Sequence, residues 1–340
     1  MGAMVRKEFT QLRRDRRTAA LLVVMPLFLL LIFGYAARFE VDQARTAVVG
    51  ADAQTVAALL PAVFDVRVID TTGGRTEAVE RLRSETIDAV VVTDSRTLLL
   101  DGTQLFTAQS VQRQLGGADP DGNPPLAAEV LFNPDLDTAT VMVPALVGLI
   151  MLFIGALATS LGVVRERQTG TLEQLAVMPF SAPDLFVGKL APYLAIAVID
   201  LLVVVGVGLA VFDVPFNGSV PLFALGSLLF LFVTLSIGVL ISTVSENQGQ
   251  AVQLALMVLL PQVMLSGLIF PLESMAGVLQ AIAAVLPLTW FNQIARGVMV
   301  RGAGLAEITL PLVVLAAMGA IVFTLAIRRF ARDLAPGGAG

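Results

Sequence analysis

Six apolar windows, each long enough to cross a bilayer, constrain this chain more than any other feature of its sequence. They cover approximately 19–37, 140–164, 184–212, 220–244, 250–271 and 307–327. A transmembrane helix needs about 20 mostly apolar residues to cross a hydrocarbon core of roughly 30 Å. Composition agrees, because only 14% of the residues are charged, whereas soluble domains have about a quarter. The sequence therefore predicts an α-helical polytopic membrane protein with six transmembrane helices.

Basic residues near the ends of these windows predict the orientation of the chain. Lys and Arg are enriched on the cytoplasmic side of membrane proteins. With six crossings, three basic clusters lie on one side and both termini are cytoplasmic. The clusters are Arg13, Arg14, Arg16 and Arg17 before the first window, Arg165, Arg167 and Lys189 around the loop after the second, and Arg328, Arg329 and Arg332 after the last.

The apolar segment 275–300 is not counted as a span. Pro287 interrupts it and it carries Arg296, so its apolar runs are too short to cross a bilayer. A seventh crossing would also place the C-terminal arginines outside the cytoplasm. We interpret the segment as a re-entrant or surface-lying helix pair on the extracytoplasmic side.

The N-terminal segment allows more than one interpretation. Residues 1–17 place Val5, Phe9 and Leu12 on one helical face among basic residues, which favours a helix in the cytoplasmic headgroup layer over an unstructured basic tail. A basic start before an apolar run is also typical of a secretory signal. Here the apolar run is longer than in such a signal, and Arg38 follows it directly. An uncleaved first transmembrane helix is therefore favoured.

Residues 39–139 differ from the rest of the chain in charge and periodicity. They hold 16 acidic and 7 basic side chains, and short runs of β-branched residues alternate with helical patterns. The predicted strands are 46–52, 66–70, 87–93 and 97–102, and the predicted helices are 54–64 and 76–85. This alternation indicates a small α/β domain inserted on the extracytoplasmic side.

These windows divide the chain into five parts. The parts are an amphipathic cytoplasmic interface helix at 1–17, a first transmembrane helix at 18–38, the extracytoplasmic α/β domain at 39–139, five further transmembrane helices at 140–329 and a cytoplasmic tail at 330–340. The fourth part includes a short cytoplasmic helix at 166–179 and the extracytoplasmic re-entrant segment at 272–305.

Several classes of chemistry are excluded by what the sequence lacks. The chain has no Cys and no His, so it offers no thiol nucleophile, imidazole base or Cys/His zinc site. A P-loop needs Lys followed by Ser or Thr, but Lys7 and Lys189 are followed by Glu8 and Leu190. We predict that the chain is not an enzyme and binds no cofactor or metal. Its segregated charges indicate topology and no nucleic-acid partner.

The cytoplasmic loop after the second window has strong helix boundaries. Thr171 and Gln174 form a capping box that starts a short helix, and Pro179 ends it. A rigid, charged helix held between two membrane helices is suited to transmit force from a soluble, energy-supplying protein to a membrane domain. An ordinary structured loop is the alternative.

Polar residues inside the windows are candidates for a substrate pathway. Asp200 is an intramembrane carboxylate, which is costly and by default a functional candidate, although hydrogen-bonded structural packing is the alternative. Gln253 and Gln262 are weaker candidates for the lining of that pathway. A Gly/Pro-containing turn ends the fifth window, and we assign it to an outer gate, with a packing kink as the alternative. The gate candidates are Ser266, Gly267, Phe270 and Pro271.

Several of these stretches resemble the ABC-2 type exporter permeases. The string R-E-R-Q-T-G-T-L-E-Q-L-A-V-M-P-F-S (165–181) looks like the family signature. Five further stretches resemble the family in the expected order: K-E-F-x-Q-L-R-R-D (7–15), F-N-P-D-L (132–136), L-S-G-L-I-F-P-L-E-S-M (265–275), L-P-L-T-W-F (286–291) and R-G-V-M-V-R-G (296–302). Gln168, Met178 and Ala276 depart from the usual Glu, Thr and Pro. The long inserted domain is similar to the subgroup with a large extracytoplasmic domain.

The resemblance implies a permease subunit of an ATP-driven exporter in a bacterial inner membrane, moving an amphipathic or hydrophobic substrate such as a drug, lipid or glycolipid. It implies partners: ABC ATPase subunits that bind ATP and Mg, a second permease copy or a sister permease, and membrane lipid. Residues 166–179 would be the coupling helix that contacts the ATPase. Its candidate contact residues are Glu166, Arg167, Gly170, Thr171, Glu173 and Pro179.

Two other functional classes remain as alternatives. A secondary transporter driven by an ion gradient usually has inverted repeats and charged residues in several spans, whereas here only Asp200 is deeply placed and no repeat is visible. A membrane-anchored sensor would use the extracytoplasmic domain to bind a ligand, but it would hardly need six spans. Co-purification with an ATPase would separate the exporter from both.

Overall fold

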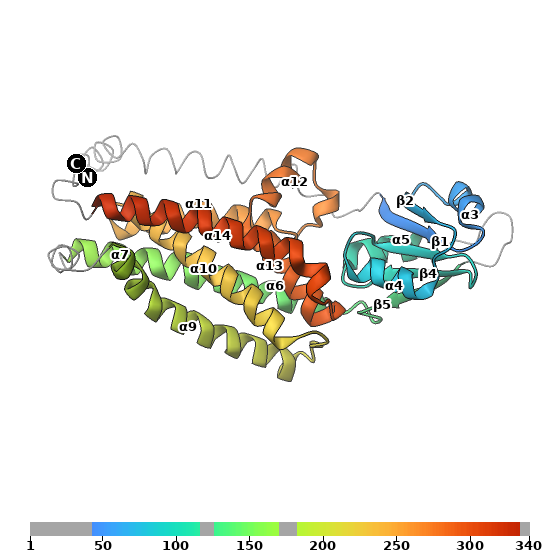
Figure 1. Cartoon of the computed structure of the whole chain (residues 1–340), viewed down its shortest axis with the longest axis horizontal. Coiled ribbons are helices and arrows are strands. Elements are labelled where there is room, and N and C mark those ends of the chain that lie inside the picture. Colours follow the sequence, from blue (N-terminus) through green and yellow to red (C-terminus); the bar gives the residue numbers. More distant parts are fainter. Residues whose placement is uncertain (1–42, 116–125, 170–181, 334–340) are drawn as a thin grey trace, which may run out of the picture.

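A computed structural model describes residues 43–115, 126–169 and 182–333. In it, a helical bundle carries a smaller α/β domain at one end (Figure 1). The predicted interface helix at 1–17, the predicted first span at 19–37 and the last residues of the tail lie outside the described residues.

The α/β domain alternates strands and helices. Its elements are β1 (Ala44–Val49), α3 (Ala53–Leu59), β2 (Phe64–Asp70), α4 (Arg75–Arg83), β3 (Ala89–Val92), β4 (Thr97–Asp101), α5 (Leu105–Leu115) and β5 (Ala127–Leu131). The sequence did not predict α5 and β5. Helix α3 is shorter than predicted because Pro61 disfavours helical backbone at the residue before it, and Leu60 is extended with ψ 140°.

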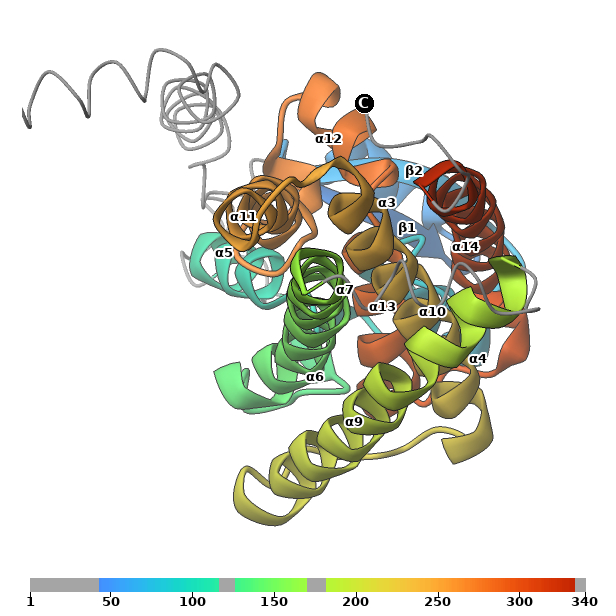
Figure 2. The ribbon, with the colours of Figure 1, turned by 90° about the vertical axis from the view of Figure 1, so that its left-hand side faces the viewer.

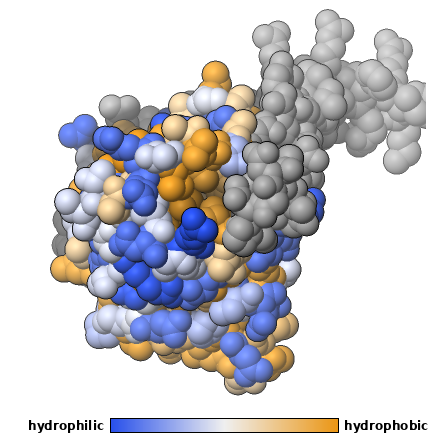
Figure 3. Space-filling view, turned by 90° about the vertical axis from the view of Figure 1, so that its right-hand side faces the viewer, coloured by the Kyte–Doolittle hydropathy of each residue, from blue (hydrophilic) through white to orange (hydrophobic). Residues whose placement is uncertain are grey.

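The five strands form one mixed sheet in the order β2-β1-β3-β4-β5. Strand β1 runs parallel to β2 and β3, whereas β4 is antiparallel to β3. Apolar side chains cover both faces, and all four residues of β3 are buried, as expected of a strand that is covered on both sides. Seen from the domain end, hydrophilic residues cover the middle of the surface, with apolar residues above them and along the lower rim (Figure 3).

Five of the described helical segments are long and apolar enough to cross a membrane. They lie in α6 (Thr138–Leu152), η1 (Phe153–Ala158) and α7 (Thr159–Gln168), which together form one span, and in α9 (Ala182–Val211), α10 (Val220–Val244), α11 (Gln248–Leu265) and α14 (Leu305–Asp333). These segments correspond to the second to sixth predicted windows. The chain is therefore a helical, polytopic membrane protein.

Small residues let α10 approach the first described span closely. A Cβ atom on Gly238 would lie 2.7 Å from the carbonyl oxygen of Gly155, and one on Gly155 would lie 2.2 Å from Thr234 Oγ1. Membrane helices associate through such close backbone approaches, because lipid provides no hydrophobic driving force between them. Helix α10 thereby joins η1 to the rest of the bundle.

The apolar segment between α11 and α14 forms η2 (Leu272–Ser274), α12 (Gly277–Ala284), α13 (Pro287–Arg296) and η3 (Gly297–Arg301). The α12 and α13–η3 pair is bent by 83°, and α11 ends and α14 begins at the domain end (Figure 1). Helix α13 lies among α6, α10 and α14 (Figure 2), where Leu288, Phe291 and Ile294 are fully buried. Helix α13 thus packs inside the bundle while α12 bends away from it, a geometry shared by broken spans and re-entrant segments, and the re-entrant interpretation stays a prediction.

Candidate functional site

Polar contacts join the end of α11 to the re-entrant helix α13. The backbone N–H of Leu288 donates to Gln262 Oε1 at 3.3 Å. Asn292 Nδ2 donates to the carbonyl oxygen of Ser266 at 3.2 Å, and Arg296 Nη2 donates to the carbonyl oxygen of Gly267. These side chains are nine-tenths or more buried. Asn292 and Arg296 satisfy carbonyl oxygens that the end of α11 leaves without helical partners, and Gln262 satisfies a backbone N–H at the start of α13.

The predicted gate residues lie in this turn. Gly267 has φ +78°, a left-handed conformation that glycine adopts at little cost. Phe270 is 2% exposed and packs in an apolar cluster with Met264 and Met275. Ser266, Gly267 and Pro271 line a cavity at the domain end of the bundle. The structure thus brings the four predicted gate residues to one turn, and their role as a gate stays a prediction.

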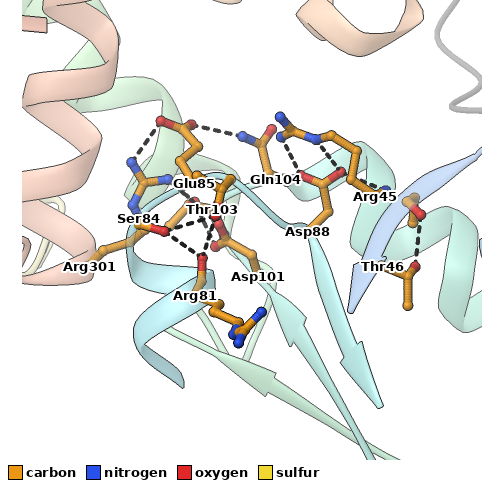
Figure 4. Close-up of polar contacts among 12 residues, drawn as sticks. Arg45, Thr46, Arg81, Ser84, Glu85, Asp88, Asp101, Thr103, Gln104 and Arg301 are labelled. Atoms are coloured by element: carbon orange, nitrogen blue, oxygen red, sulfur yellow. Dashed lines mark hydrogen bonds and ion pairs between the residues drawn. The ribbon is translucent and has the colours of Figure 1, made fainter. Parts of the chain in front are cut away.

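Arg301, at the end of η3, connects the bundle to the α/β domain (Figure 4). Its Nη2 atom lies 2.9 Å from Glu85 Oε2, and its Nη1 atom lies 3.5 Å from Asp101 Oδ2. Nη1 also donates to Thr103 Oγ1 at 3.3 Å. The side chain of Arg301 is 2% exposed and that of Asp101 is fully buried. Buried charges are stable only when paired, so these groups fix the domain against η3.

The two carboxylates of this cluster respond differently to burial. Burial raises the pKa of Asp101 to about 6, although Arg301 and hydrogen bonds from Thr103 oppose it. Burial also acts to raise the pKa of Glu85, but the attraction of Arg301, reinforced by Arg296, outweighs it and lowers that pKa. Glu85 therefore stays ionised opposite Arg301, whereas Asp101 is the carboxylate of this cluster that burial drives toward protonation.

A second joint connects the domain to the first described span. Asn133 Nδ2 donates to the carbonyl oxygen of Gly102 at 3.2 Å, and Asn133 Oδ1 accepts from the backbone N–H of Asp137 at 2.9 Å. Asp137 in turn caps α6, since its Oδ2 accepts from the N–H of Thr140 at 3.0 Å. Such caps stabilise a helix start by about 1 kcal/mol. The stretch 132–136 that resembles the family is thus the connection between domain and span.

A cavity of about 1430 Å³ lies between the α/β domain and the bundle. Its domain wall includes Arg67, Arg83 and Glu85, and its bundle wall includes Trp290 and Arg296. Charged groups of both signs and apolar side chains therefore meet in one space at this end of the bundle.

The opposite end of the bundle carries the described part of the predicted coupling segment. Helix α7 ends at Gln168, and Arg167 Nη1 donates to the carbonyl oxygens of Ser242 at 3.1 Å and Ser245 at 3.2 Å. Glu166 is partly buried beside Arg167. The other predicted coupling residues, Gly170, Thr171, Glu173 and Pro179, lie outside the described residues.

The structure does not bring the three predicted pathway residues together. Asp200 is partly buried on α9, whose neighbouring Ile196 and Ile199 are more than half exposed. Gln253 and Gln262 are both on α11 but about 13 Å apart along its axis, at 1.5 Å per residue. Gln262 holds the start of α13, and Gln253 Oε1 is buried with no hydrogen-bond partner among the described residues. A shared lining by these three residues stays a prediction.

Sequence reasoning missed the cluster of Arg301, Glu85 and Asp101. One feature of the sequence indicated such a cluster: Arg296 and Arg301 interrupt an otherwise apolar stretch. Arginines at the depth of the membrane need partners. The sequence could not identify those partners, since Glu85 is 216 positions away and 16 acidic residues of the domain were available.

Comparisons with known proteins agree with the resemblance of the motifs. The profile of a family described as ABC-2 family transporter protein matches residues 16–328. The "Probable multidrug ABC transporter permease YbhS" of Escherichia coli (strain K12) is 31% identical over 333 residues, covering 88% of each chain. The similarly named YbhR of the same strain is 29% identical over 339 residues, covering 90% of this chain and 91% of that protein. No solved structure matches the chain.

Proposed function

Because this chain belongs to the ABC-2 family of transporter proteins, we propose that it is the membrane-spanning permease subunit of an ATP-driven exporter. The chain is a multi-pass membrane permease, a transport component and not an enzyme. In the proposal, separate ABC ATPase subunits bind ATP and Mg, and the permease pairs with a second copy or with a sister permease.

The contact of Arg167 with the turn between α10 and α11 carries this proposal. The string similar to the family signature, 165–181, begins in the last turn of α7. Arg167 connects the start of that string to two carbonyl oxygens at the end of α10. A charged donor strengthens such hydrogen bonds, so a push on the loop reaches three spans together. This is the mechanical connection that a permease without its own P-loop requires.

The names of the relatives suggest the class of substrate. YbhS and YbhR are both described as probable multidrug permeases. We infer that this chain moves an amphipathic or hydrophobic compound, such as a drug, lipid or glycolipid, out of the cytoplasm or the inner leaflet. A cavity with mixed charged and apolar walls is in keeping with such compounds.

The distribution of arginines supports an orientation in the bacterial inner membrane. Arg165 and Arg167 at the end of α7, and Arg328 and Arg329 near the end of α14, lie at the bundle end opposite the α/β domain (Figure 1). Since cytoplasmic ends are enriched in arginine, we propose that the domain is extracytoplasmic and that both termini are cytoplasmic.

Single cysteines test this orientation directly, because the natural chain has none. Ser95→Cys, on an exposed turn of the domain, is expected to react with a membrane-impermeant maleimide added to intact cells. Gln168→Cys, exposed at the end of α7, is expected to react only after the membrane is permeabilised. The cysteine-free parent is the control, and labelling of position 168 in intact cells would refute the orientation.

The exporter assignment is tested by reconstitution. Co-expression with the ATPase genes of the same cell is expected to yield a stable complex. Proteoliposomes containing that complex should transport apolar dyes only when ATP is supplied. Glu173→Lys, a charge reversal in the predicted coupling segment, should weaken both association and transport while membrane insertion is unchanged. ATP hydrolysis by the purified chain alone, or transport driven by an ion gradient without ATP, would contradict the assignment.

A further inference from the structure

The cavity at the domain end is larger than a typical drug-sized pocket, and charged side chains line it. Its volume of about 1430 Å³ exceeds the roughly 300–1,000 Å³ of typical drug-sized pockets. It lies between the sheet of the α/β domain on one side and α12, α13 and α14 on the other. Its occupant is therefore expected to touch both the soluble domain and the bundle.

The walls of the cavity present both signs of charge. Guanidinium groups come from Arg45, Arg67, Arg83, Arg296 and Arg301, and carboxylates come from Asp65, Glu85 and Glu307. Arg301 is already paired with Glu85, and Arg45 with Asp88. Arg67 and Asp65 pair with each other, but their side chains are 63% and 31% exposed, and exposed pairs contribute only about 0–1 kcal/mol. Such a pair exchanges partners with a ligand at little cost. A ligand of a single charge would leave one set of groups unmatched.

Glu307, at the start of α14, has a carboxylate oxygen without a hydrogen-bond donor among the described residues. Its side chain is partly buried at the cavity wall, and Oε2 accepts no hydrogen bond from any described residue. A buried acceptor without a partner costs about 1–3 kcal/mol. An ammonium group, with three N–H donors, is the kind of group that would satisfy it.

Two features place this cavity at the level of the membrane surface. Trp290, the single tryptophan of the chain, lines the cavity and donates through Nε1 to the carbonyl oxygen of Ala284 at 2.8 Å. Tryptophan is enriched where headgroups meet the hydrocarbon core. Helix α12 crosses the bundle direction and exposes Val278 (74%), Ile282 (37%) and Val285 (66%). Their i, i+4, i+7 spacing makes one apolar stripe, typical of a helix in the membrane interface.

An apolar track leads from the cavity along α14 into the membrane. Leu310 lines the cavity and is 63% exposed, and Val313 and Ile321 are also more than half exposed further along the helix. Leu310 and Ile321 are about 16 Å apart along the helix axis, close to the roughly 15 Å depth of one leaflet. A shallow groove at Ala320, Ile321, Thr324 and Leu325 ends the track.

We propose that this cavity binds the headgroup of a zwitterionic phospholipid from the adjoining leaflet. The phosphate lies near the arginines, the ammonium group lies near Glu307, and an acyl chain lies along α14. The two charges of the headgroup match the two sets of side chains, and the apolar track accounts for the chain. Binding of this lipid needs neither ATP nor a partner subunit, so the proposal stands or falls separately from the exporter assignment.

Trp290 makes the site directly observable, because no other tryptophan contributes to the fluorescence of the chain. The full chain, purified in detergent and freed of lipid, is titrated with phosphatidylethanolamine whose acyl chains carry bromine as a quencher. Phosphatidylglycerol and diacylglycerol with the same brominated chains serve as the anionic and the phosphate-free comparison. We expect saturable quenching by phosphatidylethanolamine, competed by the unlabelled lipid, with at least about tenfold weaker binding of the other two, equivalent to about 1.4 kcal/mol.

Two variants test how the headgroup is recognised. Glu307→Gln removes the carboxylate and is expected to weaken phosphatidylethanolamine binding about tenfold while phosphatidylglycerol binding is nearly unchanged. Arg113→Gln removes an exposed arginine of the same domain that does not line the cavity, and it should leave both unchanged. The Trp290 emission spectrum without lipid verifies that each variant is folded.

Three outcomes would overturn the proposal. Equal quenching by the three brominated lipids would mean that only acyl chains are bound. Quenching that does not saturate would mean that micelle partitioning, and not a site, brings the lipids near Trp290. An unchanged preference in Glu307→Gln would mean that the carboxylate does not recognise the ammonium group.

Discussion

Arg301→Met is expected to lower the free energy of unfolding of the full chain by about 3–5 kcal/mol, because it leaves the buried carboxylate of Asp101 and the partly buried carboxylate of Glu85 without a cation. Glu85 and Asp101 lie 2.9 and 3.5 Å from the guanidinium group, and Asp101 is fully buried. Methionine keeps much of the length and apolar volume of the arginine side chain. The loss therefore reports the charge and not a cavity. Thermal and denaturant unfolding of the purified chain in detergent measure it.

A matched control removes an arginine that is paired but exposed. Arg67 pairs with Asp65 in the same domain, yet its side chain is 63% exposed. Arg67→Met is expected to cost no more than about 1 kcal/mol. A loss of similar size in the two variants would show that burial does not decide the strength of the Arg301 contact.

Removing the carboxylates that lose their cation should restore stability to the Arg301→Met variant. Adding Glu85→Gln and Asp101→Asn replaces the two carboxylates with neutral side chains of the same shape. Replacement of a whole buried ionic cluster is often nearly neutral, whereas removal of one partner is not. The triple variant is therefore expected to be more stable than Arg301→Met alone. A triple variant that is less stable would assign the first loss to packing.

Arg167→Glu is expected to reduce ATP-driven transport by about 100-fold or more. Each hydrogen bond from a charged donor contributes about 1.5–3 kcal/mol, and about 1.4 kcal/mol is a factor of ten. Arg167 makes two such bonds, to the carbonyl oxygens of Ser242 and Ser245. Glutamate cannot donate to either carbonyl oxygen. The end of α7 would then move without α10 and α11.

The measurement compares transport with ATP hydrolysis in proteoliposomes that contain the complex. Loss of a mechanical connection should lower transport per ATP hydrolysed, while the ATPase subunits still associate and hydrolyse. Arg329→Glu makes the same charge change at an exposed position near the end of α14, at the same end of the bundle, and should leave transport nearly unchanged. Equal losses in both variants would point to a general effect of charge on insertion.

The turn at 266–271 shows how far local sequence leads. Gly267 and Pro271 predicted that the fifth transmembrane helix would break there, and α11 ends at Leu265. The polar groups that hold this turn, Asn292 and Arg296, were not predicted as its partners. They follow from the fold of α13 back into the bundle, which brings together residues 26 and 29 positions apart.

The sequence by itself determined the number and positions of the described spans, the alternation of strands and helices from β1 to β4, and the family. Each of these depends on hydropathy, periodicity or a continuous motif, which neighbouring residues encode locally. Only the tertiary structure decided the position of β5, the burial of α13, the cavity beneath the domain and the pairing of Arg301 with Glu85 and Asp101. These features join residues far apart in the chain. The residues in these features find their partners through complementary shape and through the free-energy cost of burying an unpaired charge. Both act only when the domain and the bundle pack together.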